Sequence, residues 1–324
     1  MKKKFTEFAE KRPVLVFWIL AILLATALIP IAIIIFTKYP NFGEDIYIAN
    51  NNRDYNTNIL YSLPLAFKVS GGAWFAFILL AWPATASLSG IITSFILKQK
   101  AGVKDLFQKF RFWAPELTAK KGIKIWLQAI FLAVGINLLY SILRNYVSDV
   151  EPQEFFKINT IYSLREIIFI FITSLFFDGG GLMEEIGWRG FALPRLQMKF
   201  TPLKSSIILG VIWSLWHIPV KFDLLFSSPS YFLSFYFIFT LVCILYCIVI
   251  TYFYNRLGGS ILIGVTFHGL MNDSTGIKRI FNADSLVIND FVSTGLLAVI
   301  FMAVVFVILY REGAMLGKRE TKLL

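Results

Sequence analysis

Apolar residues form long runs along the chain, and short polar clusters separate these runs. A bilayer core about 30 Å thick needs roughly 20 apolar residues for each helical span. By this measure eight runs predict membrane-spanning helices, at residues 14–37, 73–97, 125–143, 161–182, 205–219, 231–254, 260–280 and 291–310. The pattern therefore predicts an all-α, polytopic integral membrane protein with about eight transmembrane helices.

The composition agrees with this fold class. The chain of 324 residues is 57% hydrophobic and only 16% charged, and its mean hydropathy of +0.69 lies outside the range of ordinary soluble domains. We recognise no soluble module, low-complexity tract or internal repeat, so we expect a single integral membrane domain over residues 1–324. The first run is too long for the core of a signal peptide, which predicts a retained helix.

The basic residues predict how the chain is oriented. Cytoplasmic flanks of membrane helices carry the excess of Lys and Arg. If the N-terminus is inside and eight spans alternate, 22 of the 31 basic residues fall on the cytoplasmic side. We expect both termini in the cytoplasm and the formal net charge of +11 to favour anionic membrane lipid, with no nucleic acid as partner. The Lys- and Asn-rich loops are compatible with a bacterial plasma membrane.

A basic segment between the second and third runs has a helical pattern of its own. The stretch VKDLFQKFRFW has lysines and an arginine among apolar residues at helical spacing, which are Val103, Leu106, Phe107 and Phe110. This pattern predicts a short helix lying on the cytoplasmic membrane surface. An ordinary basic loop is the alternative.

Ionisable residues occur where the chain is otherwise apolar. The stretch GGGLMEEIGWRG, residues 179–190, places two glutamates and an arginine directly behind the fourth run, and both histidines of the chain, His217 and His268, lie inside apolar runs. A charged side chain at the centre of a bilayer costs roughly 2.5–3.5 kcal/mol on insertion scales. These residues are therefore candidates for function, although a single histidine could equally bridge two helices by a hydrogen bond.

Distances along the chain predict where these residues meet. Residues 200–203, with Pro202, form a break between two helices. Glu184 precedes this break by about 17 residues and His217 follows it by about 16, so a helical hairpin brings both to nearly one depth. His268 lies roughly 12 Å into a run that begins on the cytoplasmic side. We expect the three side chains to share a water-reachable chamber in the cytoplasmic part of the membrane.

Spacing within each helix adds further residues to this group. Glu185 and Arg189 are four residues apart, which favours an internal ion pair that holds the arginine. Glu184 is rotated by about 100° from that pair and left free. His268 and Asn272 share the same spacing, so both can face one cavity. A carboxylate, two imidazoles and a carboxamide suit the activation of water and the stabilisation of an oxyanion.

Three short motifs carry these residues in order. EEIGWR is a Glu-Glu-x-x-x-Arg motif, WSLWH is similar to a Phe-x-x-x-His motif, and HGLMN is a His-x-x-x-Asn motif. Together they resemble the CPBP family of intramembrane proteases (CAAX protease and bacteriocin-processing, also called Abi), which includes the glutamate-type CAAX prenyl endopeptidases. The resemblance covers a CPBP-like catalytic core at residues 161–276, whereas the first three runs match only in general character.

The resemblance implies proteolysis of a peptide or membrane-protein substrate within the bilayer. Carried over to this chain, Glu184 would activate the attacking water with help from His217. His268 and Asn272 would stabilise the oxyanion of the tetrahedral intermediate. The choice between a prenylated protein and a bacteriocin leader, and the oligomeric state, are open at this level.

The resemblance implies a supporting role for the ion pair, and the chain departs from the family pattern nearby. Glu185 and Arg189 would support the site or contact the substrate. Trp213 stands where phenylalanine is usual, so the pocket is expected to be narrower. Asp178 and the triple glycine are also departures, and we expect the glycines to serve close helix packing rather than a hinge.

Zinc is a possible cofactor. Two histidines and one glutamate could supply three zinc ligands and leave one position open for water. His-Glu-x-x-His is absent, however, and His-x-x-x-Asn is not a usual zinc pair, so we prefer a mechanism that requires no metal.

Two other classes of function compete with a protease. A noncatalytic immunity or scaffold protein could use the same fold to bind a peptide, but it would not need the whole polar set. A proton-coupled transporter could use buried carboxylates and histidines as a relay. No inverted repeat or pair of broken helices supports a transporter.

Overall fold

The computed structural model describes residues 2–51, 56–148, 151–158, 163–272, 277–279, 281 and 289–318. Within these ranges every regular element is a helix, apart from two isolated β-bridges, Asn58–Asp178 and Ile158–Phe281. This confirms the all-α prediction. The first half of the chain forms α1 (Lys2–Lys11), α2 (Pro13–Ala27), α3 (Ile29–Lys38), α4 (Phe42–Ala49), α5 (Ile59–Ala66), α6 (Gly72–Phe107), α7 (Ala119–Tyr146) and the 3₁₀-helix η1 (Pro152–Glu154).

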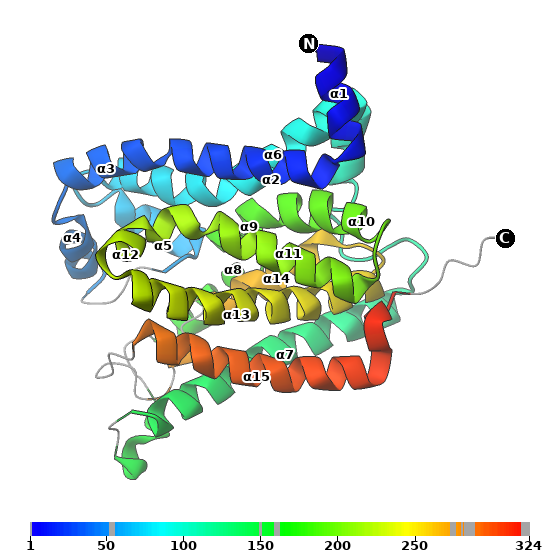
Figure 1. Cartoon of the computed structure of the whole chain (residues 1–324). Coiled ribbons are helices and arrows are strands. Elements are labelled where there is room, and N and C mark those ends of the chain that lie inside the picture. Colours follow the sequence, from blue (N-terminus) through cyan, green and yellow to red (C-terminus); the bar gives the residue numbers. More distant parts are fainter. Residues whose placement is uncertain are drawn as a thin grey trace.

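The second half of the chain supplies shorter and more broken helices. They are α8 (Leu164–Phe177), α9 (Gly179–Glu185), the π-helix η2 (Ile186–Ala192), α10 (Leu193–Leu196), α11 (Pro202–Trp216), η3 (Ile218–Lys221), α12 (Phe222–Ser227), α13 (Pro229–Arg256), α14 (Ile261–Met271), η4 (Ile277–Arg279), α15 (Asp290–Glu312) and η5 (Gly313–Met315). In Figure 1 the long helices lie side by side, with α1, α10 and the end of α15 at one end of the bundle and α3, α4 and α12 at the other.

Five helical segments of the described chain are long and apolar enough to cross a membrane: Pro13–Lys38, Gly72–Phe107, Ala119–Tyr146, Pro229–Arg256 and Asp290–Met315. A sixth span results if α11 and the following η3–α12 segment, bent by 46°, count as one. The remaining two predicted spans correspond to α8–α9 and to α14, which has only 11 residues. The structure is thus a multi-pass membrane protein, and helix length by itself does not reach the predicted count of eight.

Polar residues break the two short spans. The helix of the fourth predicted span is interrupted at Asp178, and α14 ends before Asn272. Non-helical backbone is tolerated at membrane depth where it is buried in protein or lines a cavity. Residues 161, 162, 273–276 and 280 of the predicted spans lie outside the described residues.

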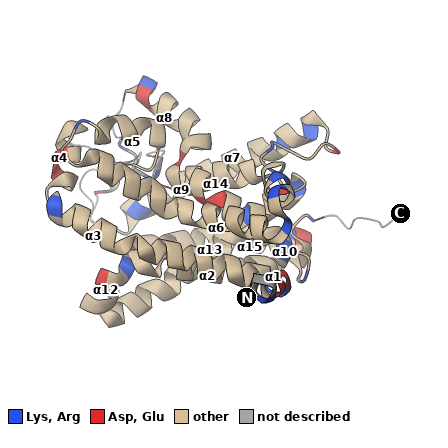
Figure 2. Ribbon diagram, turned by 90° about the horizontal axis from the view of Figure 1, so that it is seen from above, with Lys and Arg blue, Asp and Glu red and all other residues tan. Residues whose placement is uncertain are grey.

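Charged residues concentrate at the helix ends. Figure 2 shows basic positions gathered around α1 and α10, with a largely uncharged bundle between the two ends. The predicted helix in the basic segment is present as the last part of α6, after a kink at Lys98 and Gln99. It ends at Phe107, before the last of the residues whose spacing predicted it.

Close backbone contact brings the segment that carries the glutamates against α6. The α-carbon of Gly187 in η2 lies 3.1 Å from the place a Cβ of Gly90 would take, and a Cβ on Gly187 would lie 2.3 Å from the carbonyl oxygen of Ala86. Small residues allow membrane helices to approach in this way. Because α6 packs along both α9 and η2, it holds the glutamates at a defined depth.

Candidate active site

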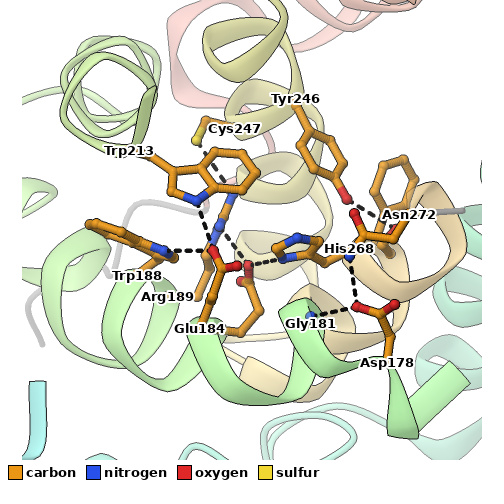
Figure 3. Close-up of polar contacts among 12 residues, drawn as sticks. Asp178, Gly181, Glu184, Trp188, Arg189, Trp213, Tyr246, Cys247, His268 and Asn272 are labelled. Carbon is orange, nitrogen blue, oxygen red and sulfur yellow. Dashed lines mark hydrogen bonds and ion pairs between the residues drawn. The ribbon is translucent and has the colours of Figure 1, made fainter. Parts of the chain in front are cut away.

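Two consecutive glutamates end α9, and each takes a different set of partners. Glu184 has 5% of its surface exposed and Glu185 has none. Glu184 Oε2 accepts hydrogen bonds from the indole nitrogens of Trp213 at 2.8 Å and Trp188 at 3.2 Å (Figure 3). The prediction that Glu184 is free is therefore wrong for one of its two oxygens, because two tryptophans converge on it.

The predicted ion pair between Glu185 and Arg189 is confirmed. Arg189 Nη1 donates to Glu185 Oε1 at 2.7 Å, and both side chains are fully buried. Glu185 has a second partner that the sequence did not indicate. His268 Nδ1 lies 2.9 Å from Oε1 of Glu185. Arg189 Nη2 also donates to Cys247 Sγ at 3.3 Å. Glu185 therefore joins Arg189 of η2 to His268 of α14.

His268 and Asn272 stand at the end of α14, where the helix stops. The backbone of Asn272 is extended, with φ −68° and ψ 167°, although its N–H still donates to the His268 carbonyl. Its side-chain nitrogen donates to Asp178 Oδ1 at 2.7 Å (Figure 3). Both residues line one cavity, as their spacing predicted. The hydrogen bond to Asp178, as well as helical periodicity, holds the Asn272 side chain near His268.

His217 ends α11 in an aromatic setting. Its Nδ1 lies 2.9 Å from the carbonyl oxygen of Trp213, and its ring packs 4.8 Å from Trp216 and 5.2 Å from Phe239, between ring centroids. In the described part of the chain no hydrogen bond joins His217 to Glu184. The two side chains instead line the same cavity.

Trp213 lies between the groups that the sequence predicted to converge. Its indole nitrogen binds Glu184, and its ring centroid lies 5.3 Å from that of His268 and 5.7 Å from that of His217. Glu184, His217 and His268 therefore converge as predicted, and the indole ring of Trp213 lies among them. Trp213 both narrows the pocket and supplies a hydrogen-bond donor.

The cavity beside these residues has a volume of about 1030 Å³. Its polar lining includes Glu184, His217, His268 and Asn272, and most of its remaining lining is apolar or aromatic. It extends to α3 and α12, the end of the bundle opposite to α1. The placement of this chamber in the cytoplasmic part of the membrane stays a prediction. Beside the cavity, α11 ends at His217, and the chain bends by 46° into η3 and α12.

The glycines before Glu184 permit close packing. A Cβ on Gly181 would lie 2.6 Å from the Val265 carbonyl oxygen, and a Cβ on Gly180 would lie 2.8 Å from Asn272 Nδ2 and 3.3 Å from His268 Nε2. Gly180 and Gly181 therefore serve close packing of α9 against the segment of α14 and Asn272, whereas a Cβ on Gly179 would have the Thr57 carbonyl oxygen as its nearest neighbour, at 3.4 Å.

Zinc was the alternative cofactor for the two histidines and one glutamate. In the described part of the chain, no group of three His, Cys, Asp or Glu side chains is arranged to hold a metal ion. Glu185 and the Trp213 carbonyl face Nδ1 of the two imidazoles, so these contacts leave Nε2 of each ring for another partner. The mechanism without a metal stays a prediction.

Two participants were missed in the sequence. Trp188 follows Glu184 by four residues, which is the spacing that predicted the neighbouring ion pair, so its contact was within reach of the same rule. Asp178 was noted only as a departure from a family pattern. Its contact with Asn272 spans 94 residues of sequence and had no local signal.

The part of the chain that carries these residues is similar in sequence to known proteins. A family model described as type II CAAX prenyl endopeptidase Rce1-like matches residues 159–273, which contain all three motifs. The chain is also similar to "CAAX prenyl protease 2" of Methanococcus maripaludis, with 26% identity over 265 residues that cover 75% of this chain and 90% of that protein. The recognition from three motifs is thereby confirmed: this chain is a membrane protease related to the CAAX prenyl endopeptidases.

Proposed function

We propose that the chain is an intramembrane endopeptidase that hydrolyses a peptide bond of a membrane-associated protein or peptide, with water activated by Glu184. One observation carries the proposal. Two indoles hold Oε2 of Glu184, whereas no hydrogen bond from a described group reaches its other oxygen, and this carboxylate lines the cavity. A water molecule placed beside Oε1 would lie within hydrogen-bond distance of this carboxylate, which could then act as its general base.

The remaining polar residues suit the other steps of the reaction. Glu184 takes a proton from water as the oxygen attacks the scissile carbonyl, and the proton later passes to the leaving amine. Since a carboxylate only accepts hydrogen bonds, Glu185 favours a proton on Nδ1 of His268. In its protonated form His268 can also donate from Nε2 to the oxyanion, together with the Asn272 amide. His217 would assist Glu184 from across the cavity.

The supporting architecture and the surroundings of this site are parts of the same proposal. Residues 161–276 would form the catalytic core of a single integral domain, with Glu185 and Arg189 as support and no metal required. The apolar cavity favours a substrate that presents apolar groups. Both termini would face the cytoplasm of a bacterial cell, next to anionic lipid. Since the cavity extends away from the end that carries α1, a substrate would then enter from the outer half of the membrane.

Cleavage of a candidate peptide in liposomes tests the chemistry. Glu184→Gln and His217→Ala should each remove turnover while the thermal unfolding midpoint stays unchanged. Glu154→Gln, at a half-buried glutamate paired with Lys157 and outside the site, is the matched control and should cleave like the wild type. Full turnover in both site variants would refute the assignment. Zinc in stoichiometric amount, whose removal abolishes cleavage, would overturn the metal-free mechanism.

Labelling from one side of the membrane tests the orientation. Cysteines would be introduced singly at Glu10, near the N-terminus, and at Lys68, near the opposite end. The natural Cys243 and Cys247 are buried and form a low background. A membrane-impermeant maleimide applied to intact cells should label only Lys68→Cys, and the reverse pattern would contradict the proposed topology.

A further inference from the structure

Asp178 is a buried carboxylate that the proposed chemistry leaves without a role. It stands at the break between α8 and α9, with none of its surface exposed. Its Oδ1 accepts hydrogen bonds from the Gly181 backbone and from Asn272 Nδ2, both at 2.7 Å, and its Oδ2 accepts one from Thr57 Oγ1 at 2.5 Å. A carboxylate in an apolar interior is costly unless it is fully hydrogen-bonded. We therefore expect a function of the Asp178 carboxylate that offsets the cost of burying it.

We propose that Asp178 is a positioning residue that fixes the Asn272 carboxamide for oxyanion stabilisation. This inference rests on the proposed function. Asn272 lies beyond the last turn of α14 with an extended backbone, so the helix does not hold its side chain. A carboxylate is an acceptor only, so the group facing Asp178 must be the NH₂ of the amide and not its oxygen. One N–H binds Asp178, and the other is left to meet a substrate oxygen.

The backbone around Asp178 is held by a segment far away in the sequence. Gly179 N donates to the Thr57 carbonyl at 2.8 Å, beside the Asn58–Asp178 bridge. Asn58 Nδ2 in turn donates to Thr173 Oγ1 at 2.7 Å, near the end of α8. The segment that carries Thr57 and Asn58 therefore holds the backbone at the break between α8 and α9. Asp178 is thereby kept in one position as the partner of Asn272.

Gly180 places the carboxamide next to the imidazole. The site of its missing Cβ lies 2.8 Å from Asn272 Nδ2 and 3.3 Å from His268 Nε2. Asn272 Nδ2 and His268 Nε2, the two nitrogens proposed to bind the oxyanion, therefore both lie next to Gly180. Capping of α9 would require only the bond to Gly181, so it does not account for the contacts of Asp178 with Asn272 and Thr57.

Steady-state kinetics can separate positioning from simple helix capping. We would measure kcat and KM for Asp178→Ala, Asp178→Asn and Thr57→Val, in the full-length wild type and in an Asn272→Ala background. Loss of one oxyanion donor costs about 10²–10³ in kcat, and a misplacement of 1 Å about 10². We expect Asp178→Ala to lower kcat by about 10²-fold, with KM within about threefold. Asp178→Asn keeps an acceptor oxygen and should lose less.

The double variant carries the decisive comparison. If Asp178 acts through Asn272, Asp178→Ala should change kcat by less than about threefold once Asn272 is alanine. The same loss in both backgrounds, or an effect on KM alone, would overturn the inference. Should Asp178→Ala fail to fold, Asp178→Asn and Thr57→Val provide the same comparison with less disturbance. Absence of cleavage by the wild type would instead overturn the proposed function, and this inference with it.

Discussion

Trp213 donates its indole N–H to Glu184 Oε2 at 2.8 Å, across 29 residues of sequence. The bond joins α11 to α9 and fixes the orientation of the carboxylate. Because Oε2 is occupied, the other oxygen of Glu184 is the one available to a water molecule in the cavity. Trp213 thus has a specific physical effect at the candidate base, which a phenylalanine, lacking a donor, could not have.

Trp213→Phe should lower kcat by about tenfold, because a hydrogen bond to a charged group contributes roughly 1.5–3 kcal/mol and Trp188 still holds the carboxylate. Turnover of a peptide in liposomes is the measurement. Trp216→Phe is the matched control, since Trp216 donates to Thr85 at 3.2 Å and not to Glu184. Equal losses in the two variants would show that aromatic packing, and not the bond to Glu184, matters.

Glu185→Gln should destabilise the protein by about 3–5 kcal/mol, because it leaves the buried Arg189 guanidinium without a counter-charge. Glu184→Gln should leave stability nearly unchanged, since an amide oxygen can still accept from the indoles. Thermal unfolding of both variants in the same detergent tests this. A larger loss for Glu184→Gln would reverse the roles assigned to the two neighbours.

Gly181→Ala should destabilise the contact between α9 and α14 by about 1–3 kcal/mol, the usual cost of overpacking. Its added methyl group would lie 2.6 Å from the Val265 carbonyl oxygen. Gly135→Ala in α7 meets no atom within 4 Å and is the control. It should be neutral or slightly stabilising, because alanine is the better helix former. Similar unfolding midpoints for both variants would contradict the packing role.

The burial of Lys109 should make the free energy of unfolding depend on pH. Burial, and next to it the positive charge of Arg195, lower the pKa of Lys109 from 10.5 to about 8. Below pH 8 the ammonium is charged in both states, and the folded state bears the full cost of its burial. Between pH 8 and 10.5 the unfolded chain binds more protons, so stability gained from Lys109 rises with pH.

The comparison of the wild type with Lys109→Met isolates this term. The unfolding midpoint of the wild type, relative to that of the variant, should rise between pH 7.5 and about pH 10. Lys109 Nζ also donates to the Gly190 carbonyl at 3.3 Å, and this bond is weaker once the ammonium has lost its proton, so it reduces the expected rise. A difference that falls with pH would contradict the lowered pKa.

Local rules accounted for much of the candidate site. Four-residue spacing correctly predicted the contact of Glu185 with Arg189 and, had it been applied once more, would have found Trp188. Three motifs in order were sufficient to recognise the family. The bond between Asp178 and Asn272 had no such signal, since it depends on where two helices break and how they face each other.

The sequence by itself determined that this is a multi-pass membrane protein and which of its runs are strongly apolar, because the cost of burying polar groups in a bilayer acts on each run separately. It also determined which side chains share a face of one helix, because helical periodicity is local. Only the tertiary structure decided that His268 lies beside Glu185, that Trp213 donates a hydrogen bond to Glu184 and that the cavity extends away from α1. These features depend on the rotation, bending and termination of helices against one another, and these are set by packing across the whole bundle.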